Sequence, residues 1–552
     1  HPDAITEFLQ CKMTSLRDPS ELPGITDAVP IIAAAIKRRD PIVVYGDYDA
    51  DGMTSAAILV GALRLLDATV SYHVPNRISD GYGLNEDAIR RQHQLGKKVV
   101  ITVDCGITNV SAAQLCRDLG VQLVITDHHT FADQLPDADA IVHPRLPGHS
   151  YPFGDLCGAG VAFKLAWALC QEICGGKIVT DALRQYLLRA MGLAAIGTVA
   201  DMVPLQGENR ILVKHGLRTL LKEPPAGLRN LMQLTKLDQK SQLSAEDISF
   251  MLAPRLNAAG RLGQAQLGVE LLIIDAGERA TQLASYIHDL NKQRETIERR
   301  VIAAAKKQIE TDYDIESEPA FVIAGVGWHP GVLGLVAGRM ADRYQRPVAA
   351  ISIDASGKPA VGSLRAGNEN LNVHAALMEC DDLLIRGGGH PAAAGLTIEE
   401  KNIDAFRTEF CEAITRQLTD NETLSAIEID AESTLGQLTL QTLRQIDQMA
   451  PFGIGNPRPI LCSTAVRLAE PAKRIGGGDR HLTVRFDQDG VQIRGVAFGA
   501  GEHCDALNNH DGPLDIVYRP VINEFAGRRS VEMHLIDFRP STVTQLASKA
   551  NA

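Results

Sequence analysis

The chain has 552 residues, of which 45% are hydrophobic, and a formal net charge of −12. This length is too great for one compact core, so two to four domains of an ordinary soluble globular type are expected. The acidic balance excludes a protein coated in basic surface, so any nucleic-acid site must be a local groove.

The ten cysteines include no Cys-x-x-Cys pair, which argues against a zinc ribbon and against a disulfide framework. Cys170 and Cys174 are one helical turn apart and, without a second pair, are interpreted as core thiols. The longest apolar run, Ala190–Ala200, is too short to span a bilayer. We therefore expect a cytoplasmic protein without membrane attachment.

The first 40 residues predict an irregular cap that ends in a helix over Ile25–Arg39. From Ile42 onward, strand and helix patterns alternate as in βαβ units, which indicates a mainly parallel sheet. The expected strands are 42–45, 69–74, 99–103, 121–125 and 140–142, and the expected helices are 54–66, 85–94 and 110–118. Helices follow over Gly160–Cys174, Asp181–Val199 and Ala245–Leu252.

A long helix is predicted over Glu278–Glu310, as a connection that packs a second domain against the first. A coiled-coil dimer is the rival interpretation, but the stripe includes an arginine and only about three heptads. The expected inward positions are Leu283, Ile287, Leu290, Arg294, Ile297, Val301 and Ala304.

A second α/β block is predicted over residues 321–414, and it contains a glycine-rich stretch, Arg386–His390. Its glycines would let backbone amides approach a phosphate, but such a stretch is more often a turn. Its expected strands are 321–325, 348–352 and 360–364, and its expected helices are 332–343 and 371–379. The last region predicts strands at 460–468, 481–487, 491–498, 514–522 and 530–537, which match an OB-type barrel, with a β-sandwich as the alternative. The fold class is thus α/β multidomain, with boundaries at 1–40, 41–275, 276–312, 313–418 and 419–552.

Three acids crowd the end of the first strand, at Asp47, Asp49 and Asp51. An isolated cluster of this kind is most often a surface loop, but open α/β sheets bind their ligands at the carboxyl ends of strands. An EF-hand is excluded because Ile58 stands where the twelfth loop position requires glutamate.

Two further strands end in potential ligands: strand 99–103 precedes Asp104, and strand 121–125 precedes Asp127-His128-His129. Asp201, after an apolar helix, is a fourth candidate. Helix caps could explain any single acid, but they do not explain the histidine pair. Carboxylates with one or two imidazoles suit Mn²⁺ or Mg²⁺ better than zinc, and two such ions are a common device for phosphodiester hydrolysis.

These segments resemble the four motifs of the DHH phosphoesterase superfamily. The second block resembles the accessory DHHA domain, through Gly362–Arg365 and Gly388–His390. Two stretches narrow the resemblance to the bacterial RecJ exonuclease family: Ala253–Leu262 and the Pro451–Pro457 loop before the barrel. The resemblance covers roughly residues 40–540. It implies a DHH catalytic domain over 41–275, a connecting helix, a DHHA-type substrate-binding domain, and an OB-like domain with a C-terminal tail.

The resemblance implies a single-stranded-DNA exonuclease that works from the 5′ end, releases mononucleotides and depends on two Mn²⁺ or Mg²⁺ ions, in DNA repair and recombination. One ion would be held by Asp49 and Asp104. The other would be held by Asp51, Asp104, His128 and Asp201, with Asp104 bridging. His129 would contact the scissile phosphate, and Asp47 and Asp127 would orient the ligands.

One position departs from the related inorganic pyrophosphatases. Tyr45 stands where those enzymes have a metal-binding histidine. We therefore expect the first metal site to have fewer ligands and to fill completely only with substrate present.

An exonuclease needs a pocket for the terminal phosphate, and arginine offers paired contacts to phosphate. Arg255 has an alternative role in bracing its own loop. Likewise, Trp328-His329-Pro330 is equally compatible with base contact and with helix capping. The candidates for phosphate binding are Arg77, Arg255, Arg261, Ser363, Arg365 and His390.

The barrel region 451–540 has eleven basic and eleven acidic residues, so it is less acidic than the rest of the chain. We expect a single-strand track there, built from cations in loops and from an aromatic side chain, with a plain solvated surface as the alternative. The expected track residues are Lys473, Arg474, Arg480, Tyr518, Arg528 and Arg529.

Four other functions fit the sequence less well. A DHH phosphodiesterase acting on cyclic dinucleotides or short oligonucleotides would lack the barrel and the long helix, and so would a pyrophosphatase. A catalytically silent DNA-binding replication scaffold would have lost ligands that are present here. No Gly-x-x-x-x-Gly-Lys-[Ser/Thr] loop supports an ATPase. The expected partners are single-stranded DNA with a 5′ end and a single-strand-binding protein or helicase, and the expected state is a monomer.

Overall fold

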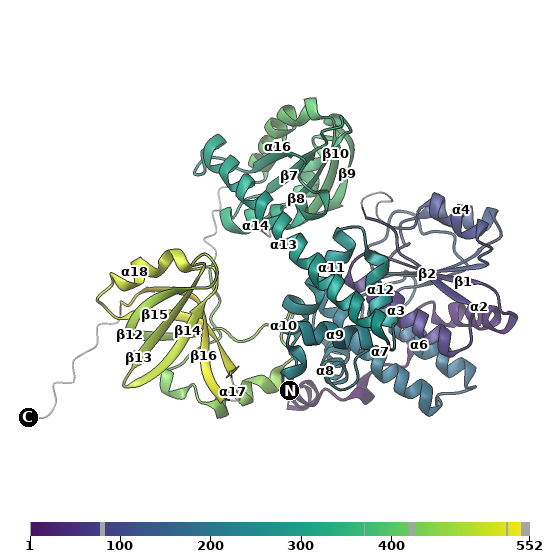
Figure 1. Cartoon of the computed structure of the whole chain (residues 1–552), viewed down its shortest axis with the longest axis horizontal. Coiled ribbons are helices and arrows are strands. Elements are labelled where there is room, and N and C mark those ends of the chain that lie inside the picture. Colours follow the sequence, from purple (N-terminus) through teal and green to yellow (C-terminus); the bar gives the residue numbers. More distant parts are fainter. Residues whose placement is uncertain (1, 78–82, 369, 419–425, 526–527, 543–552) are drawn as a thin grey trace, which may run out of the picture. The chain divides into compact units, whose positions relative to one another are not determined.

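A computed structural model describes residues 2–542 apart from 78–82, 369, 419–425 and 526–527 (Figure 1). The expected C-terminal tail lies outside the described residues from 543 onward. The chain forms two compact units. The larger one comprises residues 13–203 and 207–422, and the smaller one comprises residues 1–12, 204–206 and 423–552. Helix α1 (Pro2–Gln10) is therefore grouped with the C-terminal region rather than with the first domain.

The first sheet is five-stranded and parallel throughout, in the order β2-β1-β3-β4-β5. Its strands are β1 (Ile42–Gly46), β2 (Val70–His73), β3 (Val99–Val103), β4 (Gln122–Thr126) and β5 (Ala140–Val142). The register pairs Gly46 with Val103 and Val103 with Thr126, so three neighbouring strands end at one level. Asp47, Asp104 and Asp127 are the next residues, and this alignment brings them to one edge of the sheet.

Helices cover this sheet, as the βαβ rhythm predicted. They are α2 (Ile25–Arg38), α3 (Ala50–Leu65), α4 (Glu86–Gln94), α5 (Val110–Asp118), α6 (Gly158–Ile173) and α7 (Asp181–Ala200). Helix α3 begins at Ala50, not at Thr54 as predicted, because the Asp49 side chain caps it by accepting a hydrogen bond from the Gly52 N–H. Asp51 therefore lies in the first helical turn.

More helices complete the larger unit before the connection: α8 (Gly207–Lys222), α9 (Ala226–Leu234), α10 (Ala245–Asp247), α11 (Ala253–Arg261) and α12 (Ala265–Ile273). The predicted helix over Ala245–Leu252 is instead one short α-helical turn followed by a π-helical turn, Ile248–Leu252, that leads directly into α11. Within the part of the chain that the structure describes, no helix is long and apolar enough to cross a membrane.

The long helix α13 (Glu278–Asp312) is confirmed, but its buried stripe shifts along its length. Leu283, Ile287, Leu290 and Arg294 are buried as predicted, whereas Ala304 is exposed and Ala305 is buried. The predicted stripe assumed a 3.5-residue repeat, and a straight α-helix has 3.6 residues per turn, so the buried face moves by a residue over several turns.

The second sheet has the order β6-β7-β8-β10-β9 and carries apolar clusters on both faces. Its strands are β6 (Phe321–Val326), β7 (Val348–Ile353), β8 (Ala360–Arg365), β9 (Leu384–His390) and β10 (Ala393–Ile398). Its helices are α14 (Leu333–Tyr344), α15 (Val373–Met378) and α16 (Ile403–Gln417). The glycine-rich stretch 386–390, expected to be a turn, is part of edge strand β9 and pairs with β10.

The C-terminal strands close into a barrel in the order β12-β13-β14-β16-β15, with β15 returning to β12. This closure confirms the OB-type prediction and excludes a sandwich. The strands are β12 (Leu461–Ile475), β13 (His481–Gln488), β14 (Val491–Ala497), β15 (Leu514–Phe525) and β16 (Arg528–Pro540). Helix α18 (Cys504–Asn508) follows β14 in the chain and lies at one end of the barrel (Figure 1).

Candidate metal centre

The edge where β1, β3 and β4 end holds a buried cluster of carboxylates and imidazoles. Asp47, Asp104 and Asp127 are each at most 4% exposed. Three sets of side chains could each hold a cation, because the ligand atoms inside each set lie within 4.8 Å of one another. The sets are Asp47, Asp49 and Asp104; Asp51, His128 and Asp201; and Asp104, His128 and His129. The structure therefore brings together every metal ligand that the sequence predicted.

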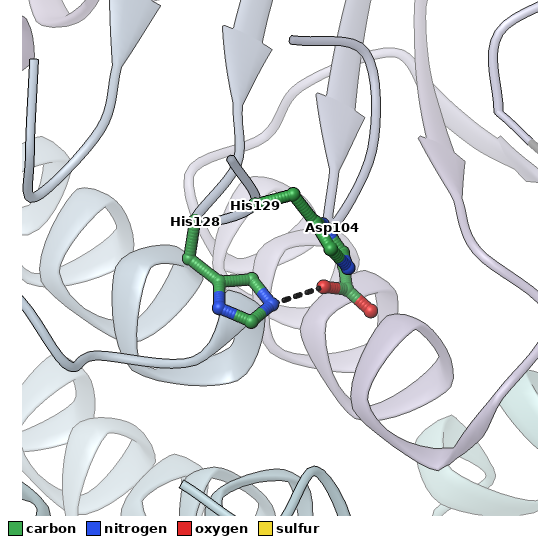
Figure 2. Close-up of side chains that lie close together, drawn as sticks. All are labelled: Asp104, His128 and His129. Carbon is green, nitrogen blue, oxygen red and sulfur yellow. Dashed lines mark ion pairs between the residues drawn. The ribbon is translucent and has the colours of Figure 1, made fainter. Parts of the chain in front are cut away.

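His128 lies at the centre of this cluster. Its Nε2 atom is 3.1 Å from Asp104 Oδ1, 3.6 Å from Asp201 Oδ2 and 3.9 Å from Asp51 Oδ2. Figure 2 shows the His128 ring pointing at the Asp104 carboxylate, with His129 on the adjacent position of the same loop. One imidazole nitrogen thus faces three carboxylates from three different segments.

Asp51 is fixed by the N-terminus of helix α6. Its two carboxylate oxygens accept hydrogen bonds from the Gly158 N–H at 2.7 Å and the Ala159 N–H at 2.9 Å. The positive end of a helix dipole favours a negative side chain at this place. Asp51 therefore keeps a defined orientation at the start of α3.

Several buried polar atoms at the centre make no hydrogen bond. Among the described residues, Asp47 Oδ1, Asp104 Oδ1 and His128 Nε2 are buried and accept or donate no hydrogen bond. Buried polar atoms without partners are costly, and ligation of a cation removes that cost. Oxygen donors with one imidazole nitrogen and no thiolate fit Mn²⁺ or Mg²⁺.

Burial and mutual repulsion disturb the acids of the cluster. Burial, with the charge of Asp49, raises the pKa of Asp51 to about 6, and burial with the charges of Asp51 and Asp49 raises the pKa of Asp201 to about 8. The pKa of Asp104 is raised well above its usual value by burial and by the neighbouring aspartates. Such crowding of carboxylates is relieved when a cation binds.

Asp127 and His129 form a separate ion pair beside the cluster. Asp127 Oδ1 lies 2.7 Å from His129 Nδ1, and its other oxygen accepts a hydrogen bond from the Ile107 N–H. Although burial opposes both shifts, this pairing lowers the pKa of Asp127 to about 2 and raises the pKa of His129 to about 9. His129 is therefore positively charged at neutral pH. In contrast, burial and the charge of His129 lower the pKa of His128 to about 3, so its ring is neutral.

Two side chains that the sequence did not single out hold the histidine loop in place. Arg145 donates a hydrogen bond to the His128 carbonyl at 2.8 Å, and His143 Nε2 lies 2.9 Å from the His129 carbonyl. Both follow strand β5, which lies beside β4. The sequence does contain a signal for them. Both are polar residues that closely follow a strand, and that strand lies beside the strands that end in the ligands.

Two glycines are also part of the site's construction. A side chain at Gly158 would place its Cβ 2.6 Å from Asp104 Cβ, and one at Gly197 would place it 2.4 Å from Asp51 Oδ1. Asp104 itself has φ of 61°, a left-handed conformation that costs free energy in a non-glycine residue. The backbone thus gives up stability to place these ligands.

A second cluster, the arginine cluster, contains Arg77, Arg261 and Arg365. Arg261 is half-buried, and this partial burial together with the charges of Arg77, Arg294 and Arg365 lowers its pKa to about 10. Its guanidinium donates to the Gly331 carbonyl at 3.1 Å. Half-buried like charges of this kind indicate a site for an anion.

Ser363 and Arg365 share strand β8 and lie beside the first turn of α14. A Cβ added at Gly334 would be 2.9 Å from Arg365 Nη2 and 3.7 Å from Ser363 Oγ. The N-terminus of α14 supplies backbone N–H groups beside the Arg365 guanidinium and the Ser363 hydroxyl, and all three kinds of donor can bind an anion. Four of the predicted phosphate ligands, Arg77, Arg261, Ser363 and Arg365, therefore belong to this region.

The other two predicted phosphate ligands, Arg255 and His390, are not part of the arginine cluster. Arg255 donates to His288 Nδ1 and to the Met251 carbonyl, which matches the alternative bracing role. His390 is exposed at the end of edge strand β9. Of the two interpretations of Trp328–Pro330, capping is confirmed, because the His329 ring accepts from the Gly331 N–H.

The predicted DNA track on the barrel needs correction. Tyr518 cannot stack on a base, because its side chain is 0% exposed and its hydroxyl lies 2.8 Å from Ser463 Oγ. Lys473 and Arg474 lie in strand β12 rather than in a loop, and Arg474 pairs with Asp505. Arg528 and Arg529 open strand β16, where Arg529 pairs with Glu524, while Arg480 lies in the loop before β13 as predicted.

Tyr45 takes no part in the acidic cluster. Its buried side chain belongs to the apolar cluster under α4 and α5, and its hydroxyl donates to the Gly83 carbonyl at 3.1 Å.

Comparison with known proteins matches three family models along the chain. The DHH family N-terminal domain matches residues 41–197, the DHHA1 domain matches 318–416, and the RecJ OB domain matches 429–537.

Curated relatives match over nearly the whole chain. The single-stranded-DNA-specific exonuclease RecJ of Salmonella typhimurium is 35% identical over 94% of this chain and 91% of its own length. The Bacillus subtilis protein of the same name is 36% identical over 96% of this chain, which spans 65% of that protein's length. The crystal structure of Thermus thermophilus RecJ with Mn²⁺ superposes with a TM-score of 0.79 at 31% identity, over 98% of this chain and 74% of that one.

Proposed function

The chain belongs to the RecJ family of single-stranded-DNA-specific exonucleases, and from this premise we propose that it hydrolyses single-stranded DNA from the 5′ end to mononucleotides, using two Mn²⁺ or Mg²⁺ ions. The observation that carries the proposal is the convergence of buried ligand atoms without hydrogen bonds, from Asp47, Asp104 and His128, at the ends of neighbouring parallel strands. A silent scaffold protein would have no reason to retain such costly atoms.

The ligand groups divide between two positions that share Asp104. Asp49 and Asp104 would hold one ion, and Asp51, Asp104, His128 and Asp201 would hold the other. The carboxylate of Asp47 lies within ligand distance of Asp49 and Asp104, which supports a direct role at the first position besides an orienting one. When bound, the two cations would activate a water molecule and neutralise charge on the phosphate.

His129 would supply the positive charge nearest the scissile phosphate. Its ring is protonated at neutral pH because Asp127 pairs with Nδ1, and the charged ring carries a second N–H, on Nε2, that would donate toward a phosphate oxygen. Asp127 is thus a positioning residue for His129 rather than for the metal-ligating His128.

The arginine cluster supports recognition of a terminal phosphate. Arg365 lies beside Ser363 and the first turn of α14, and the mutual repulsion of Arg77, Arg261 and Arg365 would be relieved when an anion binds. A 5′ phosphate has the charge and the three acceptor oxygens that this arrangement suits.

Digestion of a single-stranded oligonucleotide labelled separately at each end tests the proposal. With Mn²⁺, the 5′ label should appear at once as a mononucleotide, while the 3′ label should stay on long fragments. Release of the 3′ label first, or no release, would contradict the proposed polarity.

The same assay with Arg365→Ala tests the terminal-phosphate pocket. The wild type should prefer a 5′-phosphorylated strand to a 5′-hydroxyl strand, and the variant should lose about 10- to 100-fold of that preference, since a hydrogen bond to a charged group contributes about 1.5–3 kcal/mol. Arg407→Ala, at a cation on α16 that pairs with Asp404, is the matched control and should keep the preference. An unchanged preference in Arg365→Ala would assign the cluster to another contact.

Metal titration at two pH values tests the centre itself. Between about pH 7 and 8.5 the folded, metal-free protein keeps protons on Asp201 and His129 that the unfolded chain has lost, so its stability should fall as pH rises. Cation binding displaces protons from the carboxylates, so affinity and the gain in thermal stability should both be larger at pH 8.5 than at pH 7.

Calorimetry of that titration should give two unequal binding steps, because Tyr45 supplies no ligand to the first position. Two equally tight steps without DNA would contradict this asymmetry. A metal affinity that does not depend on pH would contradict the assignment of the carboxylates as ligands.

A further inference from the structure

The barrel carries an exposed aromatic side chain that the proposed function has not used. Phe498 follows strand β14 and is 64% exposed, although phenylalanine is normally buried. We propose that Phe498, held between His481 and His534, is a platform on which a base of single-stranded DNA stacks. This inference rests on the proposed function for the class of substrate and replaces the excluded Tyr518.

Phe498 is exposed but its position is fixed. Its ring centroid lies 5.5 Å from that of His481 and 5.2 Å from that of His534, and both imidazoles are nearly perpendicular to it. The next residue, Gly499, has φ of 80° and donates its N–H to His481 Nδ1 at 3.0 Å. A stacking surface that is already ordered loses little conformational entropy when a base binds.

The platform lies on the part of an OB barrel that binds oligonucleotides. OB proteins use the face of the second and third strands together with the loop that joins the first and second. Here those strands are β13, which His481 opens, and β14, which Phe498 follows. The joining loop contains Arg480, directly before His481.

Cations border the platform on both sides. The strand registers place Lys473, Thr483, Val496, His534 and Arg519 in one row across five strands. Lys473 and Arg519, at the two ends of this row, are exposed. Phosphates on either side of a stacked base would contact these two cations.

The neighbouring row lacks this character. There Arg485 pairs with Glu470 at 3.4 Å, and Arg494 pairs with Glu532 at 2.6 Å. Positive charge is thus neutralised within that row and left available beside Phe498, which favours a strand path across the platform.

A docking site for another protein is the competing interpretation of an exposed phenylalanine. The flanking imidazoles, the cations and the OB face favour a nucleic-acid base instead, because stacking accepts any base and phosphate contacts accompany it.

The test measures binding of the full-length protein in EDTA, by anisotropy, to a dT20 strand and to an abasic strand of equal length. The wild type should bind dT20 more tightly than the abasic strand. Phe498→Ala should lower dT20 affinity about 5- to 100-fold with little change for the abasic strand, and so remove the preference.

Two further variants separate loss of the aromatic face from loss of apolar volume and from an unspecific effect. Phe498→Leu should lose as much affinity as Phe498→Ala, since leucine keeps the apolar volume but has no aromatic face. Phe250→Ala is the matched control, because Phe250 is 73% exposed on the larger unit and should leave binding unchanged. As a second readout, the fluorescence of Phe498→Trp should be quenched by dT20 and not by the abasic strand.

Three outcomes would overturn the inference. The first is that Phe498→Ala binds dT20 as tightly as the wild type, and the second is that it loses equal affinity for dT20 and for the abasic strand. The third is that the fluorescence of Phe498→Trp changes equally with dT20 and with the abasic strand. A wild type that binds neither strand would instead refute the proposed substrate, and the platform with it.

Discussion

Asp104→Asn is expected to lower the rate of single-stranded DNA hydrolysis about 10³-fold or more. Asp104 is the carboxylate that we propose to be shared by both ligand positions, and its Oδ1 makes no hydrogen bond among the described residues. An amide oxygen is a weaker ligand than a carboxylate and cannot bridge two cations. Bound cations stabilise the transition state by several kcal/mol, and the variant would lose that stabilisation. Each loss of about 1.4 kcal/mol lowers the rate tenfold, so a decrease of about 10³-fold is expected.

Thermal unfolding separates this effect from misfolding. Metal-free Asp104→Asn should unfold at a temperature no lower than the wild type, because an amide brings no charge into a site already crowded with acids. Added Mn²⁺ should then stabilise the variant much less than the wild type.

The matched control is Asp118→Asn, at an exposed aspartate in α5 that accepts a hydrogen bond from Gln114. It should keep the wild-type rate and the wild-type response to Mn²⁺. A rate in Asp104→Asn within tenfold of the wild type would show that the bridging ligand is another residue.

Gly197→Ala is expected to lower the rate about 100-fold or more although it adds a single methyl group far from solvent. The new Cβ would lie 2.4 Å from Asp51 Oδ1, 2.5 Å from Ala159 Cβ and 2.6 Å from Thr54 Oγ1. Helices α3, α6 and α7 meet at this point, so the ligand or a whole helix must move. Displacing a reacting group by about 1 Å can cost 100-fold in rate, and overpacking costs about 1–3 kcal/mol of stability.

Gly192→Ala, in the same helix, provides the control. Its Cβ would meet the Leu220 side chain at 3.1 Å, a contact that a flexible side chain can relieve. This variant should keep both the rate and the affinity for Mn²⁺, which are the two quantities to measure. Wild-type values of both in Gly197→Ala would show that Asp51 is not a ligand.

The place of the candidate metal centre could be predicted from sequence because a parallel sheet aligns the ends of its strands. Each of Asp47, Asp104 and Asp127 directly follows a short run of β-branched and apolar residues, and β1, β3 and β4 are consecutive neighbours in the sheet. Once a run of residues is recognised as a strand, its last residue locates the acid that follows it.

The barrel shows where the same reasoning fails. Tyr518 lies in a strand, where alternate side chains point to opposite faces, and the choice of face depends on pairing with β12 and β16. Phe498 looked like the end of a strand, and its exposure follows from the left-handed Gly499 and the two imidazoles beside it. The glycine-rich stretch 386–390 was misjudged for a related reason, since its pairing with β10 makes it a strand.

The sequence by itself predicted the strands of the first sheet, the family and the candidate ligands, because hydrophobic period and motif spacing are local properties of the chain. The tertiary structure alone decided that helix α6 fixes Asp51 and that Gly197 leaves room for it. These contacts join residues more than 100 positions apart. Their geometry is set by how helices and strands pack, and no local pattern records it.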